Sequence, residues 1–342
     1  MSRGTRGLIV AVAVLLPALA SSTPPPRWIL AYAGSAPGHG PATYTIDDFM
    51  RLITVVDSTG QSRLWLTSGA IFLELFAPSG HVFEPDLGGP QADGADWAVY
   101  LDSLFTVSGV LERLDSAVAM ATAVLGPPSA PYQVSVMIPY PASRDAQLQF
   151  LGTTYSLWSP RGRRDVALAY IAEVRRRFQA DSLRHLSLDG FYWLHELVPQ
   201  PDSALLTEVG NALHDSQLRF LWIPYYDAPG WDHWRAFGFD EAWLQPNYFF
   251  DRSVPAIRLD SAVARALRND MGLEIEFDSR LLGNMQFNDR LAPYLAALLM
   301  NPGLRDRAIA IYDGEGTLAQ LSRSRSLPAV VRYRGLWTTL RR

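Results

Sequence analysis

The feature that most constrains the fold is a regular alternation of short apolar runs with longer segments of helical periodicity. Eight runs of strand length recur, at residues 28–33, 64–76, 133–139, 186–194, 220–225, 241–247, 273–277 and 308–312. Between them, helical periodicity covers residues 97–125, 163–178, 203–215, 259–270 and 289–300. Alternating strands and helices are typical of a parallel sheet, because each parallel strand needs a crossover connection.

The number of strand–helix units selects among parallel-sheet folds. Eight units predict an α/β protein with a single closed (β/α)8 TIM-type barrel spanning residues 28–342. An open, doubly wound sheet is the alternative, but no glycine-rich nucleotide-binding turn follows any of the expected strands. The chain has no internal repeat and no linker that would divide it.

The first residues have the pattern of an export signal. Arg3 and Arg6 precede an apolar run at residues 8–19, and small residues then follow. We expect a cleaved signal peptide at residues 1–20 and a proline-rich leader at residues 21–27, and hence a secreted or periplasmic protein. An uncleaved anchor is the alternative, although the apolar run is short for a membrane span.

The amino-acid composition excludes several classes of catalytic and metal-binding site. The 342 residues include no cysteine and no lysine, so all 30 basic residues are arginine. Thiol nucleophiles, thiolate metal sites, disulfides and Schiff-base lysines are therefore excluded. A net charge of −4 argues against nucleic-acid binding. Carboxylates, histidines, hydroxyls and aromatics remain to carry any reaction.

Carboxylates follow two of the expected strands. In (β/α)8 barrels the active site lies at the carboxyl ends of the strands. The fourth expected strand leads to Glu196, and the seventh carries Glu274, Glu276 and Asp278. Because strand side chains alternate, the last three should face the barrel axis. Structural ion pairing is the alternative for such acids, above all for Glu274, the lowest on its strand.

Most glycoside hydrolases use two carboxyl groups, one on each side of the bond that is cleaved. We expect Glu196 to act as general acid/base and Glu276 as nucleophile, or as base for water. The placement resembles that of a large clan of retaining (β/α)8 glycosidases, with the acid/base after strand four and the nucleophile on strand seven. That clan has asparagine before the acid, whereas this chain has His195, which could hydrogen-bond the acid or a sugar hydroxyl.

Amides and aromatics near the strand ends suit a sugar. Gln245 and Asn247 should face the axis, where an amide can both donate to and accept from hydroxyls. Aromatic faces offer platforms for sugar rings, although core packing is the alternative for part of them. The expected substrate-binding residues, besides His195, Glu274 and Asp278, are Tyr192, Trp193, Tyr225, Tyr226, Trp231, Gln245, Asn247 and Tyr248.

Metal and cofactor sites have weaker signals. The six histidines show no zinc-binding spacing. Asp227 and Asp232 flank an aromatic loop and leave calcium or substrate binding open. No Gly-x-Ser-x-Gly turn indicates a serine hydrolase. We therefore expect no metal and no cofactor, a monomer, a carbohydrate as partner, and neither nucleic acid nor, after signal cleavage, membrane.

Five blocks of sequence resemble those of domain-of-unknown-function family 4855. They are MIPYP at 137–141, GFYWLHE at 190–196, LWIPYY at 221–226, GFD at 238–240 with QPNYF at 245–249, and GLEIEFD at 272–278. Their order and spacing are kept from about residue 31 to the C-terminus. The resemblance implies a secreted bacterial protein with a glycosidase-like barrel, and no activity that can be carried over.

Two readings of function follow. The first is an exported glycoside hydrolase that acts on a poly- or oligosaccharide through Glu196 and Glu276. The second is a non-catalytic glycan-binding barrel, in which the same groups only hold the sugar. The structural question that separates them is whether the two carboxylates face each other across one cleft.

Overall fold

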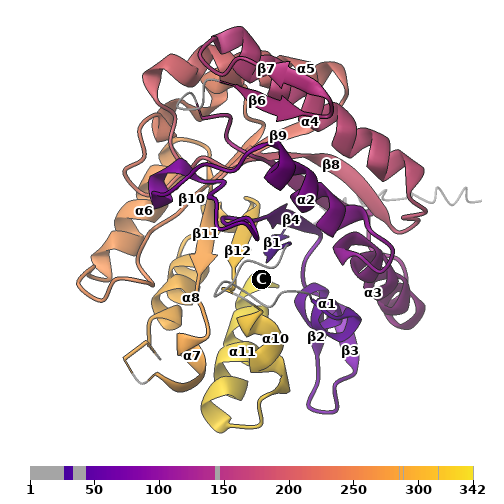
Figure 1. Ribbon diagram of the computed structural model, residues 1–342. Helices are drawn as coiled ribbons and strands as arrows, with labels where there is room; N and C mark the ends of the chain where they lie inside the picture. The colour runs from indigo at the N-terminus through magenta and orange to yellow at the C-terminus, as the bar shows by residue number, and fades with distance from the viewer. Residues whose placement is uncertain are drawn as a thin grey trace, which may run out of the picture.

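The frame of the protein is a closed barrel of eight parallel strands, in the order β1-β12-β11-β10-β9-β8-β5-β4 (Figure 1). The computed structural model describes residues 27–33, 44–142, 147–284, 286–287, 289–314 and 316–341. The barrel strands are β1 (Arg27–Tyr32), β4 (Gly69–Leu73), β5 (Tyr132–Ile138), β8 (Leu186–Trp193), β9 (Arg219–Trp222), β10 (Glu241–Leu244), β11 (Gly272–Glu276) and β12 (Ile309–Tyr312). All eight predicted strand regions contribute a strand, so the predicted barrel is confirmed.

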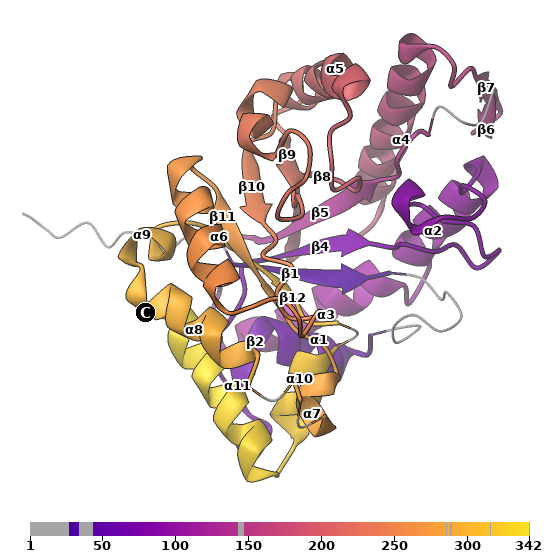
Figure 2. The ribbon, with the colours of Figure 1, turned by 90° about the vertical axis from the view of Figure 1, so that its left-hand side faces the viewer.

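Helices surround the barrel on its outer side (Figures 1 and 2). They are α1 (Ile46–Ile53), α2 (Gly94–Phe105), α3 (Val110–Leu125), α4 (Pro160–Ala180), α5 (Ser203–Asp215), α6 (Ile257–Arg268), α7 (Arg280–Gly283), α8 (Leu291–Met300), α9 (Pro302–Arg305), α10 (Thr317–Arg323) and α11 (Leu327–Leu340). Two antiparallel hairpins are added to the barrel, β2 (Thr54–Val56) with β3 (Ser62–Trp65), and β6 (Leu148–Phe150) with β7 (Thr153–Tyr155). The described residues also form 3-10 turns at Pro85–Leu87, Gln200–Asp202 and Trp231–Phe237.

The structure corrects the expected helix at residues 97–125, which is two helices. α2 ends at Phe105 and α3 begins at Val110. Ser108 between them has a positive φ of 59°. Gly109 precedes α3, and a Cβ at that position would lie 2.5 Å from the carbonyl oxygen of Thr106. The chain therefore turns too tightly here for a continuous helix.

Two tryptophans fill the middle of the barrel. The rings of Trp28 on β1 and Trp243 on β10 meet edge to face, with centroids 6.2 Å apart. Glycines on the neighbouring strands make room for them. A Cβ at Gly69 would lie 2.6 Å from the Trp28 ring, and one at Gly272 would lie 2.5 Å from the Trp243 ring. The inside of the barrel is thus a packed core on which a site can be held rigidly.

Polar side chains lie nearer the amino ends of four strands. Gln133 donates to Asp189 at 2.9 Å, and Arg219 pairs with Asp189 at 3.3 Å. Arg219 also pairs with Glu241. These contacts tie β5, β8, β9 and β10 together.

The expected signal peptide and leader fall at residues 1–27, of which only Arg27 lies within the described residues. Within the described part of the chain, no helix has the length and apolar character needed to cross a membrane.

Candidate active site

The carboxyl end of β8 places Glu196 at the mouth of the barrel. Glu196 follows the strand by three residues and is partly exposed. Tyr192 is buried, and desolvation, together with the charges of Glu196 and Glu274, raises its pKa. Trp193 points elsewhere, packing edge to face on Tyr140 and Phe220 with centroids 5.8 Å and 6.1 Å away. Trp193 is 1% exposed and is part of the packed core.

The two glutamates of β11 lie on the inner face of the barrel. Glu274 is paired in register with Ala310, which is paired with Trp28 of the barrel core. Glu274 and Glu276 are each 1% exposed. Oε1 of Glu274 forms no hydrogen bond within the described residues. Asp278 is partly exposed and is paired with Arg280 at 2.7 Å, so it is occupied by an ion pair.

The carboxylate of Glu276 accepts hydrogen bonds from one side chain and from the backbone of two residues. The Tyr294 hydroxyl, from α8, donates to its Oε2 at 2.5 Å. The backbone N–H of Tyr248 donates to the same oxygen at 3.3 Å, and the backbone of Asn247 also hydrogen-bonds this carboxylate. The Tyr248 ring lies under the Arg290 guanidinium at 3.8 Å. Glu276 is thus fixed in position by the loop after β10 and by one helix.

The segment after β10 links Glu196 to Glu276. Gln245 donates from Nε2 to Oε1 of Glu196 at 2.8 Å. Asn247 donates from Nδ2 to Oε1 of Gln245 at 2.9 Å and accepts from the backbone N–H of Tyr226 at 2.7 Å. Asn247 has a φ of 50°, a left-handed conformation that asparagine tolerates better than most residues. The same short segment therefore contacts both Glu196 and Glu276.

Burial raises the pKa of all three glutamates. Desolvation raises the pKa of Glu196 to about 8, against a hydrogen bond from Gln245 and with help from the charges of Glu84 and Glu276. Desolvation raises the pKa of Glu276 to about 7, against the hydrogen bonds that it accepts. For Glu274, desolvation and the charges of Glu276 and Glu196 raise the pKa well above its usual range. Glu274 is therefore the carboxyl that keeps its proton most firmly.

His195 is paired with Glu84, a residue that sequence reasoning did not select. Its Nδ1 lies 2.6 Å from Oε1 of Glu84, and its ring lies 4.3 Å from that of Tyr140. Oε1 of Glu84 also accepts from the backbone N–H of Asp86, whereas its Oε2 is buried without a partner among the described residues. Ligand atoms of Glu84, Asp86 and His195 lie within 4.8 Å of one another. We interpret His195 and Glu84 as a hydrogen-bonded pair, and the charge of Glu84 also contributes to the raised pKa of Glu196 after desolvation.

The expected aromatic platform is largely occupied by arginines. Tyr226 lies 4.0 Å from the Arg258 guanidinium and 3.9 Å from that of Arg265. Trp231 lies 5.1 Å from Arg265. Tyr225 is partly exposed, and the charge of Glu196 contributes to its raised pKa after desolvation and the charge of Asp86. Tyr225 is therefore the aromatic placed best for a ligand.

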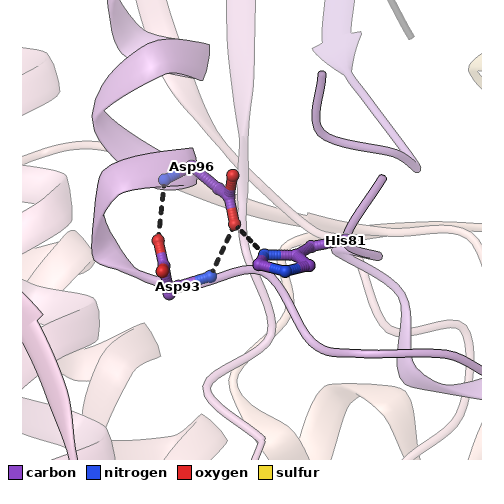
Figure 3. A group of neighbouring side chains, drawn as sticks. All are labelled: His81, Asp93 and Asp96. Carbon is purple, nitrogen blue, oxygen red and sulfur yellow. Dashed lines mark hydrogen bonds and ion pairs between the residues drawn. The ribbon is translucent and has the colours of Figure 1, made fainter. Parts of the chain in front are cut away.

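A second group of histidine and carboxylates is a helix cap (Figure 3). Asp93 accepts from the backbone of Asp96, and Asp96 accepts from the backbone of Asp93 and lies 2.6 Å from Nδ1 of His81. This reciprocal pattern is the capping box of α2. The aspartate-rich loop considered for calcium carries Asp227, which is paired with Arg265 at 2.8 Å.

Two other strand ends carry buried carboxyls that sequence reasoning missed. Glu74 follows β4 and is 2% exposed, and Asp313 follows β12 and is 1% exposed. Desolvation raises the pKa of each to about 7, against backbone hydrogen bonds. Inspection of every strand end would have found these two. Tyr294 and Glu84 come from a helix and a loop, where no sequence signal marks them.

The fold and these strand-end carboxyls define a (β/α)8 barrel with an acidic mouth. The chain belongs to the family described as domain of unknown function (DUF4855), whose model matches residues 27–336. The resemblance of the five sequence blocks to this family is thereby confirmed. A search of curated proteins finds no match.

Several solved barrels share the fold at low identity. A GH18 chitinase from Flavobacterium johnsoniae is 12% identical, with 92% of this chain and 94% of that chain covered and a TM-score of 0.44. The Group IV chitinase of Ostrinia furnacalis is also 12% identical, with 92% and 100% covered and a TM-score of 0.45. The tryptophan synthase alpha-subunit of Pyrococcus furiosus is 11% identical, with 93% and 98% covered and a TM-score of 0.40. At these scores the likeness is one of barrel fold alone.

Proposed function

We propose that this protein is a glycoside hydrolase, acting on a poly- or oligosaccharide with Glu196 as general acid/base and Glu276 as nucleophile or as base for water. The observation that carries the proposal is the bridge after β10. Gln245 hydrogen-bonds Glu196, and the backbone at Asn247 and Tyr248 hydrogen-bonds Glu276. Two carboxyls at one barrel mouth match the two roles that glycosidic cleavage requires.

The order of the pKa values supports these roles. With a pKa of about 8, Glu196 keeps its proton at neutral pH and can donate it to the glycosidic oxygen. With a pKa of about 7, Glu276 is ionised first and can attack the anomeric carbon or take a proton from water. Desolvation and the charges of Glu276 and Glu196 hold the pKa of Glu274 well above its usual range, so burial beneath them favours its protonated form.

The accessible groups around Glu196 suit a sugar. Tyr225, Gln245 and Asn247 are all partly exposed. The two amides offer both donors and acceptors, and a tyrosine combines an apolar face with a hydroxyl. This combination supports a carbohydrate as the substrate.

One observation favours the alternative, a glycan-binding barrel without catalysis. Glu276 is 1% exposed, and both Tyr294 and the Tyr248 backbone already donate to it. In that case Glu276 would only anchor the loop after β10, and Glu196 would hold a sugar hydroxyl.

A substrate screen tests the proposal. The purified protein is incubated with a panel of polysaccharides, and new reducing ends are measured. We expect release from at least one polysaccharide by the wild type, and none by the Glu196→Gln/Glu276→Gln double variant, whose cooperative melting transition should show that it is folded. Saturable glycan binding without release by the wild type would instead establish the glycan-binding alternative.

We also propose that the protein is exported, with cleavage after residue 20. The support is the basic and apolar pattern of residues 1–20. Expression with this segment should yield protein outside the cytoplasm whose amino terminus is Ser21. Recovery of the uncleaved chain from the membrane fraction would establish the anchor instead.

A further inference from the structure

A basic pocket lies on the outer flank of the barrel, apart from the strand-end carboxyls. It is bounded by the β2–β3 turn, by Arg51 of α1, and by the junction of α10 with α11. Figures 1 and 2 both show these elements together on one side of the molecule. The pocket volume is about 520 Å³, which is within the range of small-molecule sites. No residue of the candidate active site lines it.

Four arginines and one aspartate line this pocket, in a protein whose net charge is −4. They are Arg51, Arg323, Arg325, Arg334 and Asp57. An excess of positive charge in one hollow of an acidic protein favours binding of an anion there.

Two of these arginines are held in place by ion pairs. Arg51 bonds Asp47 at 2.9 Å and the Ser322 hydroxyl at 3.2 Å. Arg323 bonds Asp47 at 2.7 Å and Asp48 at 2.6 Å. Their charges are therefore balanced by aspartates of α1, and they form a fixed wall of the pocket.

The other two arginines have no such balance. The side chains of Arg325 and Arg334 form no hydrogen bond or ion pair with the described residues, and both residues are exposed. Asp57, the acidic residue of the lining, is paired with Arg63. Two guanidinium groups thus have no partner among the described residues, and each can bind a carboxylate, sulfate or phosphate group through two parallel hydrogen bonds.

An apolar wall lies beside these free arginines. Val330 is 43% exposed and Trp337 is partly exposed, and both line the pocket. The Tyr333 hydroxyl accepts from the backbone N–H of Val56, which fixes α11 against the β2–β3 hairpin. Ser322 and Ser324 add hydroxyls to the lining. An apolar wall next to free guanidinium groups suits a ring that carries an anionic substituent.

We propose that this pocket binds a small ring-bearing organic anion. Arg325 and Arg334 bind its carboxylate, sulfate or phosphate group, and Val330 and Trp337 pack against its ring. Such an anion can come from an acidic saccharide or from a nucleoside phosphate. The inference does not depend on the proposed hydrolase, because the two sites share no residue.

Calorimetric titration of the full chain tests the proposal. The probes are a digalacturonate, a sulfated disaccharide, a nucleoside monophosphate and, as a neutral ring, cellobiose. We expect at least one anionic probe to bind and cellobiose not to bind at this site. The probe that saturates identifies the source of the anion, and its affinity should fall as salt is raised.

Two double variants make the test specific. Arg325→Gln/Arg334→Gln should weaken binding of that probe at least tenfold. Arg161→Gln/Arg268→Gln removes the same charge from exposed positions on α4 and α6, and should leave the affinity within twofold of the wild type. Trp337→Ala should also weaken binding, while coincident melting curves show that the fold is kept.

Three results would overturn the inference: no binding of any anionic probe, binding that survives Arg325→Gln/Arg334→Gln, or equal weakening by both double variants.

Discussion

At the scale of single residues, the three glutamates of the barrel mouth have different hydrogen-bond partners. Glu196 accepts from Gln245, Glu276 accepts from Tyr294 and the backbone, and Oε1 of Glu274 has no partner within the described residues. Hydrogen bonds stabilise the ionised form of a carboxyl group. A buried carboxyl that accepts none therefore has its pKa raised most. Near pH 7 Glu276 therefore ionises while Glu196 keeps its proton, which is the division of roles that the hydrolysis requires.

Replacement of Glu274 by glutamine should therefore be tolerated. Because desolvation holds the pKa of Glu274 well above its usual range, glutamine resembles its protonated form in both charge and shape. We expect Glu274→Gln to keep the hydrolysis rate within about fivefold of the wild type, since general acid/base groups contribute on the order of 100-fold or more. A loss as large as that for Glu196→Gln would assign Glu274 a direct role.

The dependence of hydrolysis on pH should follow the same two groups. Hydrolysis requires Glu276 to be ionised and Glu196 to be protonated. The ionised fraction of Glu276 increases as pH rises through about 7, and the protonated fraction of Glu196 decreases as pH rises through about 8. We expect kcat/KM to be bell-shaped with its maximum between these values. With an aryl glycoside whose leaving group needs no proton, Glu196→Gln should lose the alkaline limb. A maximum below pH 6 would contradict the assignment.

At the scale of elements, the barrel strands depend on glycines that give the interior tryptophans their space. In Gly69→Ala the new methyl group would lie 2.6 Å from the Trp28 ring and 3.1 Å from the Gln133 carbonyl oxygen. We expect a loss of about 1–3 kcal/mol in unfolding free energy, the usual cost of overpacking. Gly283→Ala, where a Cβ meets nothing within 4 Å, is the matched control. Equal urea midpoints for the two variants would show that Trp28 can move aside.

The elements were predictable where periodicity was strong. All eight strands follow from apolar runs, and α5 lies at the residues expected. The helix α1 was not predicted, because its eight residues are too few to establish a period, although Thr45 and Asp48 form a capping box. The two added hairpins were also missed, since their three- and four-residue strands carry no clear alternation.

The site was predictable only in its strand-borne part. The alternation rule placed Glu274 and Glu276 inward, and the register agrees. Asp278 lies past the end of β11, where alternation no longer holds, and it turns to Arg280. Tyr294 and Glu84 reach the site through tertiary packing, which one sequence does not encode locally. The arginines that cover Tyr226 were missed for the same reason.

At the scale of the whole molecule, the buried carboxyls set the pH dependence of stability. Folding raises the pKa of Glu74, Glu276 and Asp313 to about 7 and of Glu196 to about 8. Between the unfolded pKa, about 4.3 for glutamate and about 3.9 for aspartate, and these values, the native state binds more protons than the unfolded state. Stability therefore decreases as pH rises, by up to about 1.4 kcal/mol per pH unit for each group.

We expect the midpoint of urea unfolding to be higher at pH 5 than at pH 7.5. The salt-bridged Glu173, whose pKa is lowered to about 2 mainly by hydrogen bonds from Arg176, stays ionised over this range and does not oppose the trend. Equal midpoints at the two pH values would mean that the native state keeps these carboxyls ionised.

A double-mutant cycle on Glu196 and Glu276 tests the central claim, that the two carboxyls act as one catalytic pair. Hydrolysis of the polysaccharide found by the screen is measured for the wild type, Glu196→Gln, Glu276→Gln and the double variant. Groups that act as a unit are strongly non-additive, so we expect each single variant to lose at least about 100-fold and the double variant to lose little more. Near wild-type hydrolysis by Glu276→Gln, with the loss confined to Glu196→Gln, would contradict the pair.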